Sequence, residues 1–182
     1  MKRNMMPGAM LLVLLFFFFT RHVHAQKQSL DIGVRFQKAL DMYYENGLTA
    51  QYKLTERWVL GANYISSRLG SAIGSNAIKQ DNWFVSGAYM FRPQRKLQPL
   101  VRANFGFFRA DYEADVFNAL PNTSALASVE TGLTYPITPP LKVTGSVGYN
   151  AITGDGTKGP GTLFPIFYQL SFTWNVFTKP AP

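Results

Sequence analysis

The side chains most often used in catalysis and metal binding are scarce in this sequence. It contains two histidines, His22 and His24, and no cysteine. The chain therefore forms no disulfide and has no thiolate nucleophile, and both histidines lie in a segment that we expect to be removed. A serine nucleophile needs a neighbouring base, and no histidine would remain to act as one. We expect a protein that is not an enzyme and that uses no cofactor and no metal ion.

One glycine-rich segment has the spacing of a phosphate-binding loop. Residues 154–159 read Gly-Asp-Gly-Thr-Lys-Gly and match the pattern GxGxxG. A dinucleotide site needs a strand before this loop and a helix after it, because the N-terminus of the helix holds the phosphates. Here Pro160 and Gly161 follow, and then another extended segment. Turn chemistry therefore favours a hairpin loop over a nucleotide site.

The N-terminal segment predicts export. Lys2 and Arg3 precede an apolar run at residues 10–19, and Val23-His24-Ala25 is typical of a cleavage site before Gln26. This pattern indicates a secretory signal peptide over residues 1–25, because the run is shorter than the roughly 20 residues of a spanning helix. An uncleaved anchor is the alternative. Cleavage would remove three of the 18 basic residues and leave 15 against 10 acidic residues, a net charge of +5.

The rest of the chain alternates apolar and polar residues with the two-residue period of β-strands. In Phe164–Phe177 the even-numbered residues are apolar or aromatic, and the odd-numbered residues from Gln169 to Asn175 are polar. Seven further segments repeat the pattern: Ser29–Phe36, Gly47–Leu54, Trp58–Tyr64, Trp83–Phe91, Val101–Phe107, Ala127–Tyr135 and Leu141–Ala151. We expect one eight-stranded domain over residues 26–177, followed by a tail at residues 178–182.

The connections between these strands alternate in length. Short turns follow the second, fourth and sixth strands, whereas long connections are expected at residues 37–46, 70–80, 111–124 and 153–162. An up-and-down sheet with its short turns at one end and its long loops at the other is typical of outer-membrane barrels. The sequence therefore predicts an all-β fold, an eight-stranded antiparallel up-and-down transmembrane β-barrel.

Aromatic residues on the predicted outer face fall at two heights, with an aliphatic band between them. The predicted lipid-interface aromatics are Trp58, Tyr64, Trp83, Tyr89, Tyr135, Tyr149, Tyr168 and Trp174. Two aromatic belts around an uncharged band match the girdles of membrane barrels. A soluble barrel would show the inverse pattern, with apolar residues inside and charged residues outside.

In these features the chain resembles the small eight-stranded outer-membrane proteins of the OmpA-barrel and OmpX type. The resemblance covers the whole chain after the leader and rests on architecture rather than on a motif. It implies a place in the bacterial outer membrane and insertion by the barrel-assembly machinery, which reads a terminal aromatic residue. Trp174 fits the outward register here, whereas Phe177 lies one residue out of it. Related barrel enzymes use a histidine, which also argues against catalysis.

Several charged residues fall on the predicted inner face, among them Asp31. A charge in a narrow, poorly polarisable lumen must be paired or hydrated, and an eight-stranded barrel is just wide enough inside for side chains to fill. Arg102 and Glu130 are expected on adjacent strands. We predict a polar network that plugs the lumen rather than a conduction pathway, formed by Arg35, Lys53, Arg102, Glu130 and Lys142.

The predicted loops supply the candidate contact surfaces. The connection at residues 111–124 is acidic and partly apolar, and its predicted contact residues are Asp111, Tyr112, Glu113, Asp115 and Phe117. Loops on a rigid scaffold often carry binding residues. Near the same end we expect outer-membrane lipid and lipopolysaccharide phosphates to meet basic side chains, namely Arg68, Lys79, Arg109 and Lys158. The positive charge is otherwise spread along the chain, which argues against nucleic acid as a partner.

The sequence thus predicts a structural, adhesive or complex-accessory role through the extracellular loops, with an envelope protein as a candidate partner. The alternative is a narrow, porin-like channel for small solutes or apolar molecules. A third interpretation is a soluble periplasmic ligand-binding barrel.

Overall fold

The computed structural model describes residues 28–39, 43–70, 76–112, 122–152 and 166–179. The strands are 11 to 15 residues long. They are β1 (Gln28–Ala39), β2 (Tyr43–Lys53), β3 (Trp58–Gly70), β4 (Asn76–Met90), β5 (Gln98–Tyr112), β6 (Thr123–Pro136), β7 (Leu141–Ile152) and β8 (Ile166–Lys179). In the part of the chain that the structure describes, no helix is long and apolar enough to span a membrane.

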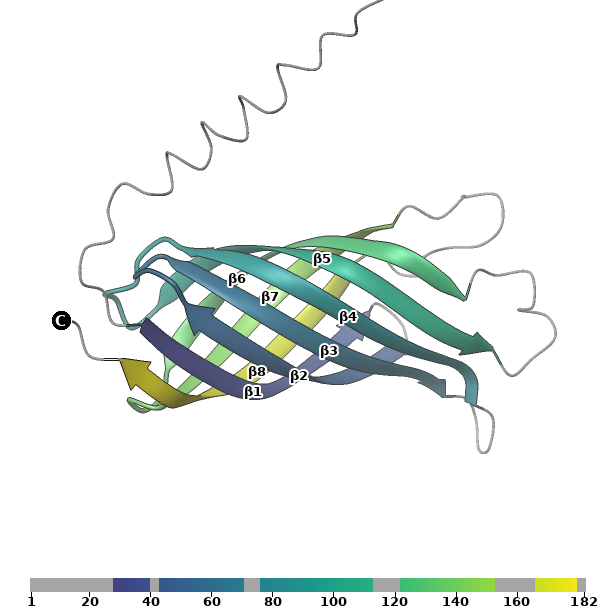
Figure 1. The fold of residues 1–182 in the computed structure, drawn as a ribbon, viewed down its shortest axis with the longest axis horizontal. Helices are drawn as coiled ribbons and strands as arrows, with labels where there is room; N and C mark the ends of the chain where they lie inside the picture. The colour runs from purple at the N-terminus through teal and green to yellow at the C-terminus, as the bar shows by residue number, and fades with distance from the viewer. Residues whose placement is uncertain (1–27, 40–42, 71–75, 113–121, 153–165, 180–182) are drawn as a thin grey trace, which may run out of the picture.

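The eight strands form a closed barrel (Figure 1). Each strand pairs antiparallel with the next, and β8 pairs antiparallel with β1. Every strand edge is therefore used, which removes the unpaired N–H and C=O groups that would be costly in hydrocarbon. The predicted fold class, an eight-stranded antiparallel up-and-down barrel, is confirmed.

The two ends of the barrel carry different connections. Residues 54–57, 91–97 and 137–140 join strands at the short-turn end, on the left of Figure 1, where β1 begins and β8 ends. Residues 40–42, 71–75, 113–121 and 153–165 lie between strands at the opposite end, which we call the long-loop end.

The strands extend further toward the long-loop end than predicted. The connection expected at residues 37–46 is wrong, because β1 continues to Ala39, β2 begins at Tyr43, and Gln37 pairs with Glu45. Most of the connection expected at residues 70–80 is also strand, since β4 begins at Asn76. The strict alternation of long and short connections is therefore wrong. Polar residues that suggested loops, such as Gln37 and Glu45, face the lumen, where polar side chains are accommodated.

A β-bulge near the end of β8 changes the register of the last residues. Asp31 pairs with Asn175, but Leu30 pairs with Phe177, so Val176 is an extra residue on β8. A bulge sets two residues of one strand against one residue of its partner. Phe177 therefore lies on the outer face opposite Leu30 and is exposed. The sequence expectation that Phe177 is out of the outward register is corrected by this bulge.

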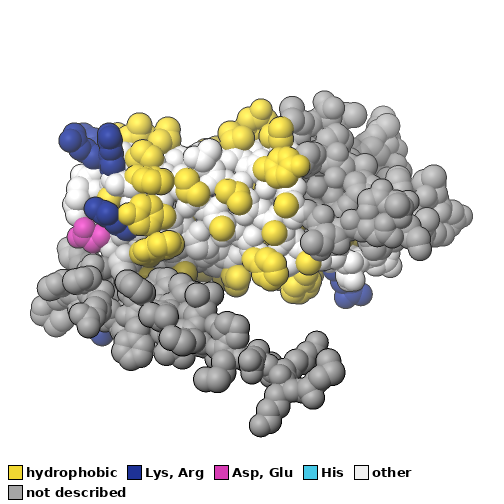
Figure 2. Space-filling view, turned by 90° about the horizontal axis from the view of Figure 1, so that it is seen from above, with side chains coloured by type: hydrophobic (Ala, Val, Ile, Leu, Met, Phe, Trp, Pro, Cys, Tyr) yellow, Lys and Arg dark blue, Asp and Glu magenta, His cyan; other side chains and the backbone are white. Residues whose placement is uncertain are grey.

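The two faces of the barrel wall differ in chemical type. Outward side chains such as Val85 and Phe105 are 63% and 66% exposed, whereas polar inward side chains such as Thr49, Asn63 and Ser128 are buried. Figure 2 shows hydrophobic side chains in two bands near the ends of the wall, with smaller ones between and charged side chains beyond the band at the short-turn end. This arrangement is the reverse of that in a soluble barrel.

Candidate functional site

The most deeply buried carboxylate among the described residues is that of Glu130, inside the lumen. Glu130 on β6 has a fully buried side chain, and its register partner is Arg102 on β5. Arg102 donates from Nη1 to Glu130 Oε2 at 3.2 Å, and Arg35 donates from Nη2 to Glu130 Oε1 at 2.7 Å. Charge-assisted hydrogen bonds of this kind are stronger than neutral ones. One carboxylate therefore binds two guanidinium groups.

Arg35 reaches this carboxylate from another part of the wall. It lies on β1, which pairs only with β2 and β8, so its side chain crosses the lumen to reach β6. Its guanidinium also donates to Gln37 Oε1 at 2.9 Å and lies over the rings of Phe84 and Phe167, at 5.3 and 5.9 Å from their centroids. The aromatic faces attract the cation. These contacts fix Arg35 across the width of the barrel.

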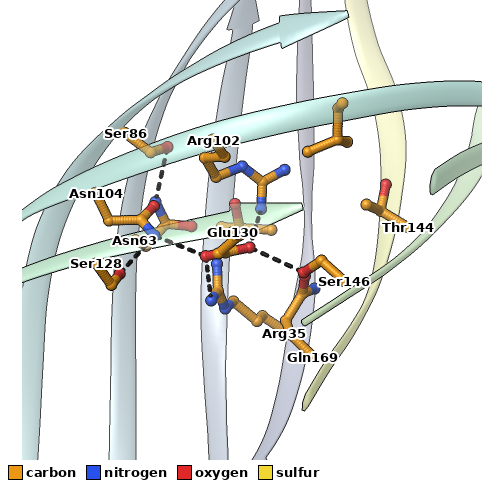
Figure 3. Close-up of polar contacts among 12 residues, drawn as sticks. Arg35, Asn63, Ser86, Arg102, Asn104, Ser128, Glu130, Thr144, Ser146 and Gln169 are labelled. Carbon is orange, nitrogen blue, oxygen red and sulfur yellow. Dashed lines mark hydrogen bonds and ion pairs between the residues drawn. The ribbon is translucent and has the colours of Figure 1, made fainter. Parts of the chain in front are cut away.

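Neutral side chains complete the coordination of Glu130. Asn104 donates from Nδ2 to Glu130 Oε1 at 2.7 Å and also lies 2.8 Å from Ser128 Oγ. Ser146 Oγ lies 2.9 Å from Glu130 Oε2 and 2.5 Å from Gln169 Oε1. Figure 3 shows these side chains converging on Glu130 from several strands. We call this set the Glu130 layer: Arg35, Arg102, Asn104, Glu130, Ser146 and Gln169.

Apolar side chains fill the lumen on the long-loop side of the Glu130 layer. The rings of Phe108 and Phe167 are 1% exposed, and they share this region with a buried cluster of Ile65, Phe84 and Leu126. Gly148 makes room for Phe167, because a Cβ atom at Gly148 would lie 2.2 Å from Phe167 Cζ. The lumen therefore contains packed rings as well as ion pairs, and the charged residues alone predicted only the ion pairs.

Glu45 is a lumen carboxylate that the sequence analysis missed. It is buried and accepts a hydrogen bond from Ser67 Oγ at 2.8 Å. It falls within the connection expected at residues 37–46, before the predicted start of the second strand at Gly47. The sequence does contain an indication that Glu45 faces the lumen. It lies eight residues before Lys53, and residues an even number apart on one strand share a face.

The predicted lumen network divides into two groups. Arg35, Arg102 and Glu130 meet in the Glu130 layer, whereas Lys142 binds Asp31 at the short-turn end, with Nζ 2.5 Å from Oδ2. Asn175 donates from Nδ2 to Asp31 Oδ1 at 2.7 Å. Asp31, Lys142 and Asn175 thus join β1, β7 and β8, and we call them the seam cluster. Lys53 lines a cavity at this same end.

The eight predicted interface aromatics lie on the outer face at two heights. Near the short-turn end Trp58 and Tyr89 are register partners with ring centroids 5.2 Å apart, and Arg57 donates to the Tyr89 hydroxyl at 3.0 Å. At the second height, midway along β3 and β4, Trp83 lies between Tyr64 and Phe107, with ring centroids 5.5 Å away in both directions. The other four are exposed: Tyr135, Tyr149, Tyr168 and Trp174.

The predicted loop surfaces are described only in part. Asp111 is exposed near the end of β5, and Tyr112 is the last residue of that strand. Glu113, Asp115, Phe117 and Lys158 lie outside the described residues. Of the basic residues expected near lipid phosphates, Arg68 lies within β3, and the register pairs Lys79 with Asp111 and Arg109 with Asp81. Each of those two cations is thus opposite a carboxylate on the neighbouring strand.

No protein-family model matches the sequence, and no curated protein matches it. Solved structures do match. The N-terminal β-barrel domain of Pseudomonas aeruginosa OprF has a TM-score of 0.61 at 16% identity, covering 82% of this chain and 98% of that chain. Outer membrane protein H (OprH) from P. aeruginosa has a TM-score of 0.57 at 13% identity, covering 81% and 99%. A de novo designed transmembrane β-barrel has a TM-score of 0.55 at 16% identity, covering 81% and 95%.

These likenesses establish the fold and not the role. The structural neighbours are small eight-stranded outer-membrane barrels, and the chain has their architecture. The expected similarity to this class is therefore confirmed. One architecture can host many unrelated functions, so the fold by itself does not define an activity. The role must be argued from the lumen and the outer surface of this chain.

Proposed function

We propose that this chain is a sealed barrel of the bacterial outer membrane that presents its long connections outside the cell. Its role would be structural, adhesive or accessory to an envelope complex, and it would involve no catalysis. The proposal includes export through a signal peptide at residues 1–25 and insertion by the barrel-assembly machinery. N-terminal sequencing of the membrane-inserted protein would test the export step, with Gln26 expected as the first residue.

The Glu130 layer is the observation that carries this proposal. Arg35 spans the lumen between β1 and β6, and Glu130, Asn104 and Ser146 extend the hydrogen-bonded set around the wall. Phe108 and Phe167 fill the lumen beside it. Moving an ion past this point would require separating buried ion pairs, which is expensive in a poorly polarisable interior. A barrel filled in this way favours display of its loops over transport.

Ion conduction is the direct test. Purified barrel in planar bilayers is expected to give no single-channel steps. The double variant Arg35→Ala/Glu130→Ala shortens the two side chains that bridge the lumen and leaves the net charge unchanged, so it should leak small ions more readily. Steps from the wild-type protein would overturn the sealed-barrel proposal and favour the porin-like alternative.

Presentation of loops requires a second measurement. Residues 113–121 connect β5 to β6 and include the predicted contact residues Glu113, Asp115 and Phe117. Replacing this connection with a short turn should leave insertion unchanged while abolishing adhesion to surfaces or association with envelope partners. If adhesion and association both persist, this connection is not the contact surface.

A further inference from the structure

The lumen contains a cavity of about 100 Å³ on the short-turn side of the Glu130 layer, lined by both polar and apolar side chains. Arg102 forms part of its inner boundary, and Glu56 and Pro93, in the turns after β2 and β4, line its outer edge. The Glu130 layer and the rings beyond it close the other side. The cavity is therefore accessible from the short-turn end.

Three cations line this cavity from different parts of the wall. Lys53 lies on β2, Arg102 on β5 and Lys142 on β7. Two carboxylates also line it: Asp31 binds Lys142 and Asn175, and Glu56 accepts a hydrogen bond from Gln94 at 3.0 Å. Arg102 must share Glu130 with Arg35, whose contact is the shorter one. The lining thus has three cations against two carboxylates, an excess of one positive charge.

Neutral groups in the wall can add hydrogen bonds to a bound anion. The hydroxyl oxygens of Thr134 and Thr144 lie 2.8 Å apart and share one hydrogen bond. One hydroxyl donates to the other, and the second hydroxyl can donate its proton into the cavity. Thr173 and the amide of Gln51 also line the space. Apolar side chains cover another part of the wall, namely Val59, Ala88, Met90 and Leu100. Electrostatic attraction is stronger beside such a surface than in open water.

Two of the turns at this end of the barrel are basic as well. Arg57, Arg92, Arg95 and Lys96 lie in the turns at residues 54–57 and 91–97, and all four are exposed. Glu56 is the single carboxylate in these two turns. A surface with one predominant sign of charge raises the local concentration of ions of the opposite sign. Anions would therefore be drawn toward this end of the barrel.

We propose that this cavity binds a small free oxyanion of the phosphate, sulfate or carboxylate class. The volume accommodates a small ion, and the strand wall separates the cavity from the bilayer, so a lipid headgroup is not the ligand. The proposal goes beyond loop display, because it assigns the periplasm-facing end of the barrel a binding site of its own.

Titration of the folded, detergent-solubilised barrel with inorganic phosphate tests this assignment. Calorimetry at low ionic strength is expected to show saturable binding at one site per chain, weakening as salt is added. Lys53→Met should weaken binding about tenfold, as expected for the loss of one charge-assisted contact. Lys179→Met is the matched control: Lys179 is an exposed lysine at the same end of the barrel, but outside the cavity.

The two lysine variants separate the cavity from general surface charge. Weaker binding in Lys53→Met with unchanged binding in Lys179→Met would support the site. Equal weakening in both variants would overturn it, because attraction to the basic end alone would then explain the binding. Absence of phosphate binding by the wild-type barrel would also overturn it. None of these results bears on ion conduction, so the sealed-barrel proposal is tested separately.

Discussion

The single carboxylate of Glu130 binds two guanidinium groups, those of Arg35 and Arg102. The stability of the lumen therefore depends on this one negative charge. A buried ion pair adds little net stability, because desolvation offsets its attraction. Removing one member is different, since the remaining charge stays buried without compensation. Arg35 is 1% exposed and Arg102 is also buried, so neither guanidinium can regain water by a small movement.

Glu130→Ala is therefore expected to lower the free energy of unfolding by about 3–5 kcal/mol. Urea titration of the protein folded in lipid vesicles measures this change. Glu56→Ala removes an exposed carboxylate from a turn and serves as the control, with an expected change within about 0.5 kcal/mol. Similar losses in the two variants would show that the Glu130 layer does not hold the guanidinium charges as described.

Two glycines on β7 provide a matched test of packing in the lumen. A Cβ atom at Gly148 would lie 2.2 Å from the ring of Phe167, whereas one at Gly145 would have no atom within 4 Å. Gly148→Ala should lower the free energy of unfolding by about 1–3 kcal/mol through overpacking. Gly145→Ala should cause no such loss. Adding Phe167→Leu to Gly148→Ala should relieve the clash, and failure to do so would contradict this packing.

At the scale of elements, the junction of β1 and β8 depends on side chains as well as on the strand ladder. Asn175 donates to Asp31 Oδ1 at 2.7 Å and accepts from Thr178 Oγ1 at 2.7 Å. Its backbone N–H donates to Pro140 O at 2.7 Å. These bonds surround the bulge at Val176, where the ladder changes register. Asn175 thus links the bulge to the seam cluster.

Asn175→Ala is expected to lower the free energy of unfolding by about 1–3 kcal/mol, because Asp31 loses a hydrogen-bond donor. Hydrogen exchange should accelerate first in β1 and β8 near the short-turn end. Amides of β4 and β5 should retain their protection and act as the internal reference. Uniform acceleration in all strands would indicate that Asn175 has no special role at this junction.

The alternation of residue types predicted the strands, but it did not predict where they end. The second strand was expected to begin at Gly47, whereas β2 begins at Tyr43 and includes Glu45 and Asn46. The same alternation placed Arg102 and Glu130 on one face of adjacent strands. It could not place Arg35 beside Glu130, since that contact spans the lumen and depends on side-chain reach rather than on register.

At the scale of the whole molecule, the outer face sets the position of the barrel in the bilayer. The chain has three tryptophans. Trp58 and Trp174 lie near the short-turn end, whereas Trp83 lies midway along β4, in the belt that is closer to the long-loop end. Aromatic side chains with a polar group favour the two membrane interfaces. The band between them is aliphatic, as the exposed Val85, Val129 and Leu133 show.

Single-tryptophan variants, made by replacing the other two residues with Phe, test this placement. The fluorescence of each tryptophan should be quenched more strongly by lipids brominated near the headgroups than by lipids brominated at the end of the acyl chains, which lies at the bilayer centre. A water-soluble quencher added on one side should reach Trp83 from the long-loop side, and Trp58 and Trp174 from the other. Strong quenching of any of the three from the bilayer centre would contradict the two belts.

The pairing of β8 with β1 also governs when the protein can become complete. Asp31 and Asn175 are 144 residues apart in the sequence but joined by a hydrogen bond. A ribosome finishes β8 last, so an emerging chain can form hairpins but cannot close the ring. Contacts this distant in sequence also form slowly. The proposed export therefore requires the chain to remain unfolded and protected until β8 has been made. A message truncated before β8 should yield protein that is degraded rather than a smaller barrel.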